Sequence, residues 1–260
     1  MMFNKKHRKN WLVGLSVLVA LYGFPCLGFA TDSPPKLVFL LLDLSGSAAR
    51  EQARDLYLKR AKEIIGGENP KDIKDSGWLK PGDRIVISAI QDRSAVKGVF
   101  TVNDELPVMN QWVDNKLKYW GLMAEKKKGI RDRLDNLLKQ PASPATEIMS
   151  ALVPAQQVFS SFPNFPRKIL VIMSDMVEES AQYNFQKRPP DKKDVDRIIA
   201  AERKQNRLPD LKGVKVYVVG AGGKSSEDLL KIRDFWLTYF QACGADLNPA
   251  DYGADLVKFE

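Results

Sequence analysis

The chain has 260 residues, with 40 basic side chains, 32 acidic side chains and a single histidine, and its net charge is +8. Residues 1–30 hold four of the basic residues, no acidic residue, the histidine and one of the two cysteines. The other 230 residues, with 36 basic and 32 acidic side chains, therefore have no histidine and only Cys243. This composition excludes an intrachain disulfide, a Cys/His zinc cluster and histidine-dependent catalysis, and the modest charge gives no indication of nucleic-acid binding.

Residues 1–30 have the pattern of a secretory signal peptide. Basic residues between positions 5 and 9 precede an apolar stretch from Trp11 to Phe24, and Gly28-Phe29-Ala30 places small residues before a cleavage site. We predict cleavage after Ala30, export to the periplasm or the extracellular space, and a single domain at 31–260 without stable membrane insertion. An uncleaved anchor is the alternative, although the apolar stretch is short for a membrane span of ~20 residues.

Apolar strands alternate with amphipathic helices through the rest of the chain. The pattern predicts strands at 36–43, 84–90, 98–102, 167–173, 214–219 and 254–259. It predicts helices at 51–65, 109–139, about 145–159, 195–204 and 226–243. Such alternation is typical of an α/β fold with a doubly wound, mainly parallel sheet, in which the short strand at 98–102 pairs antiparallel at an edge. We expect the lysines at 126–128, which can divide the long helix, to be solvated, and Cys243 to be buried.

The segment Asp43-Leu44-Ser45-Gly46-Ser47 directly follows the fully apolar run of the first strand. Ligands of open α/β sheets bind outside the carboxyl ends of the strands, so one carboxylate and two hydroxyls are expected at such an edge. Oxygen donors of this kind suit a small hard cation such as Mg2+. The same residues also occur in ordinary turns and helix caps, so the segment alone does not establish a metal site.

Asp-x-Ser-x-Ser after a buried strand resembles the von Willebrand factor A-type (VWA) domain, in which it opens the metal-ion-dependent adhesion site. The resemblance extends over nearly all of 31–260, because Ser143-Pro144-Ala145-Thr146 is similar to the family's threonine loop and Met173-Ser174-Asp175 to its later aspartate. The matched metal positions are Asp43, Ser45, Ser47, Thr146 and Asp175. The resemblance implies a Rossmann-like VWA fold and a bound Mg2+ or Mn2+ in preference to Ca2+.

Two positions depart from the family pattern. Met176 follows the late aspartate where a glycine is common, and Pro144 stands two residues before the threonine where a glycine is also common. Octahedral Mg2+ tolerates little change in loop geometry, so both residues bear on whether the site functions. Glu178 and Glu179 are expected to be surface charges; alternatively, they add negative charge near the ion.

The resemblance implies metal-dependent protein binding without chemical turnover. A partner protein that presents an Asp or Glu side chain would complete the coordination of the ion. Two alternatives remain open: an Mg2+-dependent hydrolase or phosphatase that uses Asp43, and a structural subunit whose ion only stabilises the loops. A P-loop at Gly223-Lys224-Ser225 is disfavoured, because Val218 stands where the pattern requires glycine.

Overall fold

The structure is a computed structural model that describes residues 33–46, 51–67, 77–91, 100–110 and 115–255, all within 31–260. The predicted signal peptide, Ser47 and residues 256–260 lie outside these ranges. The strands are β1 (Lys36–Asp43), β2 (Arg84–Ile90), β3 (Val102–Glu105), β4 (Arg167–Met173), β5 (Val214–Val219) and β6 (Tyr252–Gly253). The helices are α1 (Glu51–Ile65), α3 (Lys116–Leu138), α4 (Ile148–Ser161), α5 (Lys192–Lys204), α6 (Ser226–Ala242) and the 3-10 turn η1 (Pro249–Asp251).

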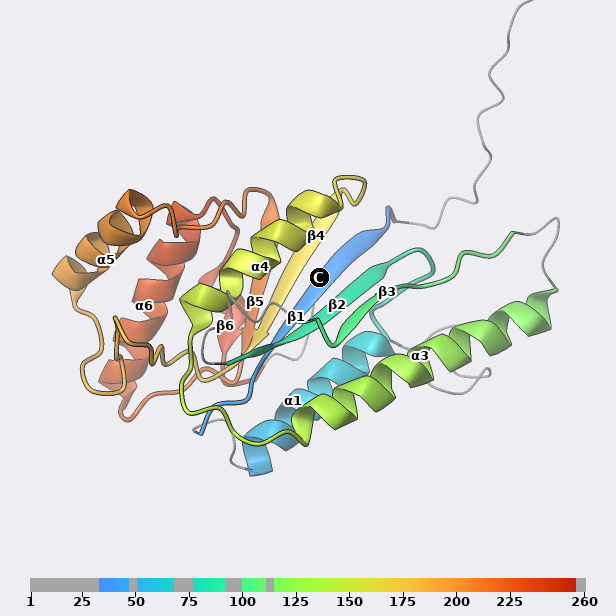
Figure 1. The fold of residues 1–260 in the computed structure, drawn as a ribbon, viewed down its shortest axis with the longest axis horizontal. Coiled ribbons are helices and arrows are strands. Elements are labelled where there is room, and N and C mark those ends of the chain that lie inside the picture. Colours follow the sequence, from blue (N-terminus) through green and yellow to red (C-terminus); the bar gives the residue numbers. More distant parts are fainter. Residues whose placement is uncertain (1–32, 47–50, 68–76, 92–99, 111–114, 256–260) are drawn as a thin grey trace, which may run out of the picture. The chain divides into compact units, whose positions relative to one another are not determined.

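The strands form one twisted sheet in the order β3-β2-β1-β4-β5-β6 (Figure 1). Only β3 runs antiparallel, against β2, and every other neighbouring pair is parallel. The predicted α/β class, with its mainly parallel sheet and one antiparallel edge pair, is therefore confirmed. None of the helices in the described ranges is long and apolar enough to cross a membrane.

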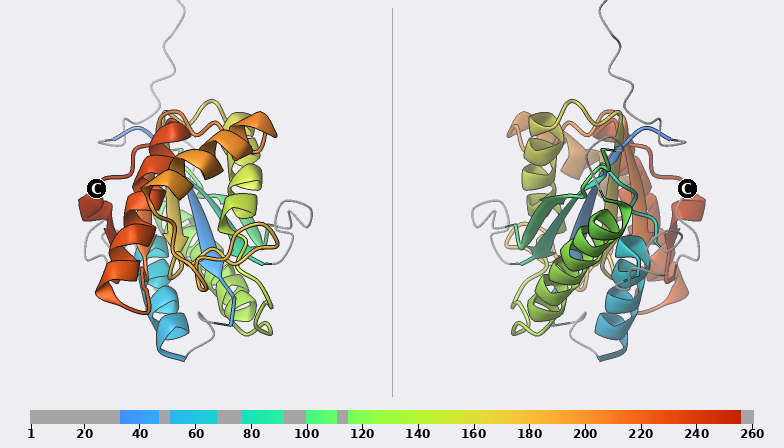
Figure 2. Two further views of the ribbon diagram at one scale, coloured as in Figure 1. Left: turned by 90° about the vertical axis from the view of Figure 1, so that its left-hand side faces the viewer. Right: turned by 90° about the vertical axis from the view of Figure 1, so that its right-hand side faces the viewer.

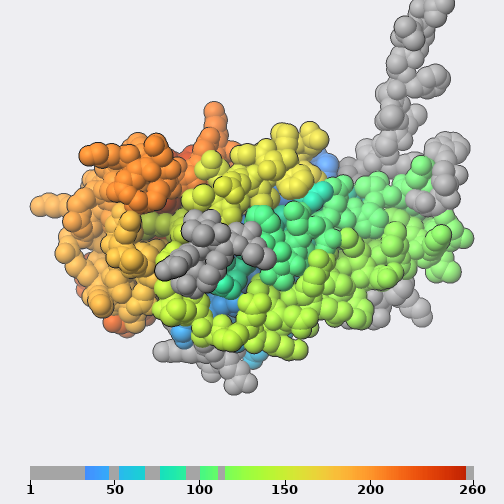
Figure 3. Space-filling view, viewed as in Figure 1, coloured from blue at the N-terminus to red at the C-terminus, as the bar shows by residue number. Residues whose placement is uncertain are grey.

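The all-apolar sequence of β1 follows from its central position, because both of its faces are covered. Leu37, Phe39 and Leu41 point into one core together with α4, α5 and α6. Val38, Leu40 and Leu42 alternate with them and point into a second core with α1 and α3. Figure 2 shows helices on both sides of the sheet, and very little of β1 is visible in the space-filling view (Figure 3).

Several predicted boundaries were wrong. The edge strand β3 lies at 102–105, so the predicted strand at 98–102 shares only Val102 with it, and residues 98 and 99 lie outside the described ranges. The last strand is β6 at 252–253, and most of the predicted strand at 254–259 lies outside the described residues. α5 begins three residues earlier than predicted, because Asp191 and Asp194 form a capping box there.

The long helix was predicted to start at 109 and possibly to break at the lysines 126–128. Instead α3 begins after Asn115, whose side chain accepts hydrogen bonds from the amides of Leu117 and Lys118, and it continues unbroken to Leu138. Lys127 is also not solvated, because its turn of the helix faces the core shared with α1. Only 2% of this residue is exposed, and its ammonium donates to the carbonyl of Leu79.

Candidate metal site

The predicted metal positions that the structure describes lie at the carboxyl edge of β1 and β4. These two central strands are parallel neighbours with Leu42 opposite Met173, so the residues that follow them, Asp43 and Ser174, meet. The Ser174 hydroxyl donates to Oδ2 of Asp43 at 2.6 Å. The register of the two strands thus places the Asp43 carboxylate against Ser174, the residue that precedes Asp175.

Asp43 is a fully buried carboxylate with protein donors on both oxygens. Besides Ser174 on Oδ2, the backbone amide of Ser45 donates to Oδ1 at 2.8 Å. Burial raises the pKa of Asp43 to about 6, the hydrogen bonds from Ser174 and Ser45 oppose that rise, and the negative charge of Asp175 adds to it. The two aspartates of the site are therefore close enough to repel each other, and a cation placed between them would relieve the repulsion.

Backbone hydrogen bonds bring three loops together around this carboxylate. The loop after β1 pairs with the loop before α4, since the amide of Ser143 donates to the carbonyl of Leu44 at 2.7 Å. The loop before α4 pairs in turn with the segment after β4: Thr146 and Glu179 exchange two hydrogen bonds, of 3.1 and 2.8 Å. Ser45 and Thr146 are both buried, at 3% and 1% exposure.

Asp175 is partly exposed and held in a tight turn. Its Oδ1 accepts from the amide of Val177 at 3.0 Å, and its carbonyl accepts from the amide of Gly222 in the loop after β5. A Cβ on Gly222 would lie 3.4 Å from the Cβ of Asp175, an ordinary van der Waals distance, so the loop after β5 packs directly against Asp175. Asp43, Ser45, Thr146 and Asp175 thus lie on neighbouring loops at this edge of the sheet, whereas Ser47 lies outside the described residues.

Met176 has a left-handed backbone, with φ at +66°. This is the conformation that glycine adopts without strain, and a residue with a Cβ adopts it at a cost of about 1–2 kcal/mol. Three contacts hold it in place: its side chain is fully buried, its amide donates to the hydroxyl of Ser174, and its carbonyl accepts from Nε1 of Trp236 at 2.8 Å. Methionine therefore replaces the common glycine without a change in the sense of the turn.

Sequence reasoning missed two residues of this region and misplaced a third. Ser174 was passed over, although its place directly after a strand parallel to β1 is the signal that could have revealed its contact with Asp43. Tyr57 of α1 is fully buried, and that burial raises the pKa of its hydroxyl, with a further contribution from the charges of Asp43 and Asp175. Glu178 is not a surface charge: it is 1% exposed, and its Oε2 accepts from the amides of Ile148 and Met149 at the start of α4.

The residues present fit a hard divalent cation. Their donors are two carboxylates and neutral hydroxyls, which are oxygen ligands of the kind that Mg2+ and Mn2+ prefer. The described residues contain no cluster of three or more His, Cys, Asp or Glu side chains that could hold a metal, so a site here depends on the hydroxyls of Ser45 and Thr146. Because both Asp43 oxygens already accept protein hydrogen bonds, water-mediated contact suits this aspartate.

A scan of protein-family models and a search of curated proteins give no match to this sequence. Among solved structures, the chain is similar to the pilus adhesin SpaC from Lactobacillus rhamnosus GG, with 10% identity and a TM-score of 0.48, over 83% of this chain and 28% of that one. It is also similar to proximal thread matrix protein 1 from the mussel byssus, whose structure has a zinc-occupied MIDAS motif (13% identity, TM-score 0.33, 77% and 39% covered). A third similarity is to the human COPII-coat protein Sec24c (9%, 0.35, 81% and 32%).

The chain spans only 28–39% of the length of these structures. At such low identities and TM-scores the similarities carry no argument about activity, ligand or partner. What the structure itself establishes is an α/β fold with the sheet order β3-β2-β1-β4-β5-β6 and one antiparallel edge pair.

Proposed function

We propose that this domain binds another protein through a divalent cation held by Asp43, Ser45, Ser47, Thr146 and Asp175. The observation that carries the proposal is the convergence of three sequence-distant loops on one buried carboxylate, with buried hydroxyl residues beside it. A bound Mg2+ or Mn2+ would supply an electrophilic centre that accepts a carboxylate from outside the domain. Since the site offers only two carboxylates of its own, an acidic side chain of the partner is the natural further ligand.

The chain's own residues contribute position and charge. The paired backbones of Thr146 and Glu179 hold the threonine loop against the segment after β4, and the left-handed turn at Met176 directly follows Asp175. Asp43 keeps the loops aligned through its contacts with Ser45 and Ser174. These hydrogen bonds hold the loops in place without a ligand, which lowers the entropic cost of binding.

Binding is favoured over hydrolysis by the placement of Asp43. A nucleophilic aspartate needs an oxygen that can reach the substrate, whereas this residue is fully buried and both of its oxygens accept protein hydrogen bonds. We therefore propose a non-enzymatic role and, from the predicted signal peptide, a site of action outside the cytoplasm. Turnover of a generic phosphoester that requires Mg2+ and disappears in Asp43→Asn would contradict this choice.

The metal site is tested by thermal unfolding with and without metal. A ligand at one hundred times its Kd stabilises the folded state by ~2.7 kcal/mol, which for a domain of this size raises Tm by about 5–10 °C. We expect that shift with Mg2+ or Mn2+, and its loss in Asp43→Asn and in Thr146→Ala. Glu125→Gln, an exposed change on α3, is the matched control and should keep the full shift. Equal melting curves in metal and EDTA would refute the site.

Recognition of an acidic side chain is tested with small probes that either carry or lack a carboxylate. Capped aspartate (Nα-acetyl-aspartate amide) and capped asparagine differ only in charge, and Mn2+ reports on ligands near it through paramagnetic relaxation of their protons. We expect the protons of the aspartate probe to relax faster only when both the protein and Mn2+ are present. This effect should be larger with the wild-type protein than with Thr146→Ala. Equal relaxation of the two probes would leave the metal site intact but overturn the proposed carboxylate recognition.

A further inference from the structure

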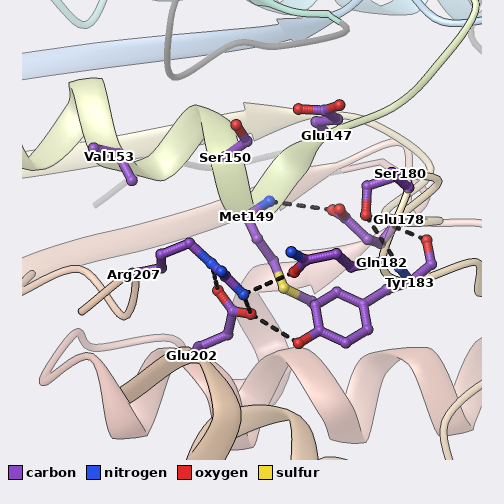
Figure 4. A pocket seen from close by; sticks show the side chains of 11 residues that line it. Glu147, Met149, Ser150, Val153, Glu178, Ser180, Gln182, Tyr183, Glu202 and Arg207 are labelled. Atoms are coloured by element: carbon purple, nitrogen blue, oxygen red, sulfur yellow. Dashed lines mark hydrogen bonds and ion pairs between the residues drawn. The ribbon is translucent and has the colours of Figure 1, made fainter. Parts of the chain in front are cut away.

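A cavity of about 210 Å3 lies between α4, the segment after β4 and the end of α5 (Figure 4). Met149 and Val153 of α4 and the ring of Tyr183 line it with apolar surface, and Glu147 and Glu178 line it with carboxylates. None of these residues belongs to the metal positions. The volume is small for a cofactor and suits a single side chain or a small amine.

Arg207, the one cationic residue among the described residues that line the cavity, is already paired with a carboxylate. Arg207 donates to both oxygens of Glu202, at 3.0 and 2.6 Å, and also to the side chain of Gln182. The Tyr183 hydroxyl donates to the same Glu202 carboxylate at 2.8 Å. This network, visible in Figure 4, neutralises Glu202 and leaves no positive group to receive an incoming anion.

Glu178 has no such cation. It is 1% exposed, it forms no ion pair with any residue in the described part of the chain, and its donors are neutral: two amides at the start of α4 and the hydroxyl of Ser180. Burial raises its pKa to about 8, and the nearby charge of Glu147 acts in the same direction. A cation that entered the apolar-walled cavity would therefore meet a buried carboxyl group that has no positively charged partner within the described residues.

We propose that this cavity is a second binding site, separate from the metal positions, and that it takes the ammonium or guanidinium group of an organic cation. The apolar walls would hold the alkyl stem, the Tyr183 ring would face the charge, and Glu147 and Glu178 would pair with it. The source is either a Lys or Arg side chain of a bound protein or a free amine. The site also lies beside the metal loop, because Glu179, which follows Glu178, pairs with Thr146.

The test is an NMR titration of the 15N-labelled domain in EDTA at pH 8, so that the metal site plays no part. The probes are capped arginine, capped citrulline, which is its neutral isostere, and putrescine. We expect the cationic probes to shift the amides of Met149 and Tyr183, and citrulline to bind at least about tenfold more weakly. Capped arginine alone would indicate a protein side chain as the source, and putrescine alone a free amine.

Substitution separates this site from general charge attraction. In Glu178→Gln the side-chain carbonyl can still accept from the two amides of α4, so the fold is kept while the charge is lost, and we expect at least about fivefold weaker binding. Glu147→Gln gives a second, less buried change in the same direction, and Glu125→Gln on α3 is the control. Equal binding of arginine and citrulline, no shifts at the cavity, or wild-type affinity in both cavity variants would each overturn the proposal, whatever the outcome of the metal experiments.

Discussion

The left-handed turn at Met176 allows a sharp test of how this chain tolerates methionine where the family commonly has glycine. Two effects oppose each other when the residue is shortened. Truncating a fully buried methionine to alanine costs about 2–5 kcal/mol of unfolding free energy. Replacement by glycine loses the same packing but also removes the strain of a Cβ at φ +66°, about 1 kcal/mol or more.

We therefore expect both Met176→Ala and Met176→Gly to destabilise the domain, with the glycine variant more stable than the alanine variant by about 1 kcal/mol. Urea unfolding followed by circular dichroism measures the difference. Met123 is the matched control, because it is equally buried but lies within α3. There the order should reverse, with glycine about 1 kcal/mol worse than alanine. If alanine is the more stable variant at both positions, the reasoning about strain at Met176 is refuted.

Three further outcomes can be checked independently. Burial lowers the pKa of Lys127 to about 8, so Lys127 binds more protons in the unfolded state between pH 8 and about 10.5. Wild type should therefore gain stability relative to Lys127→Met as the pH rises through that window, and the variant should be more stable than wild type by about 1–2 kcal/mol at pH 7. The pKa of Glu178 is raised from 4.5 to about 8, so the unfolded state releases its proton first and stability should fall between pH 5 and 8; Glu178→Gln should flatten that slope in urea titrations. N-terminal sequencing of the exported protein should begin at Thr31, and a chain that retains Met1 in a membrane fraction would contradict cleavage.

Features that repeat along the chain could be predicted from the sequence. The run Leu37 to Leu42 is apolar at every position because alternate side chains enter two different cores, and that pattern identified a central parallel strand. The edge strand β3 has only four residues and no such pattern, so its position was misjudged. The neighbourhood of Asp43 and Asp175 could be predicted because each follows a recognisable strand, and the strand register brings Asp43 beside the turn of Asp175; their role as metal ligands stays a prediction.

Features that depend on a partner far away in the sequence could not be predicted. Glu178 follows Asp175 in a stretch that reads as polar surface, and only the approach of α4, about thirty residues earlier, supplies the two amides that bury it. The same holds for Lys127, whose burial depends on the carbonyl of Leu79, and for Met176, whose strained backbone depends on Trp236.

The contacts of Glu178 and Met176 both act on the segment that follows β4. Trp236 holds one end of this segment at Met176, and the start of α4 holds it at Glu178, three residues after Asp175. Thr146 pairs with the next residue, Glu179. The same short segment therefore holds both Asp175 and Thr146 of the proposed metal site. A change that releases Glu178 from α4 should therefore loosen Thr146 and Asp175 together, and metal affinity should be sensitive to residues that never touch the ion.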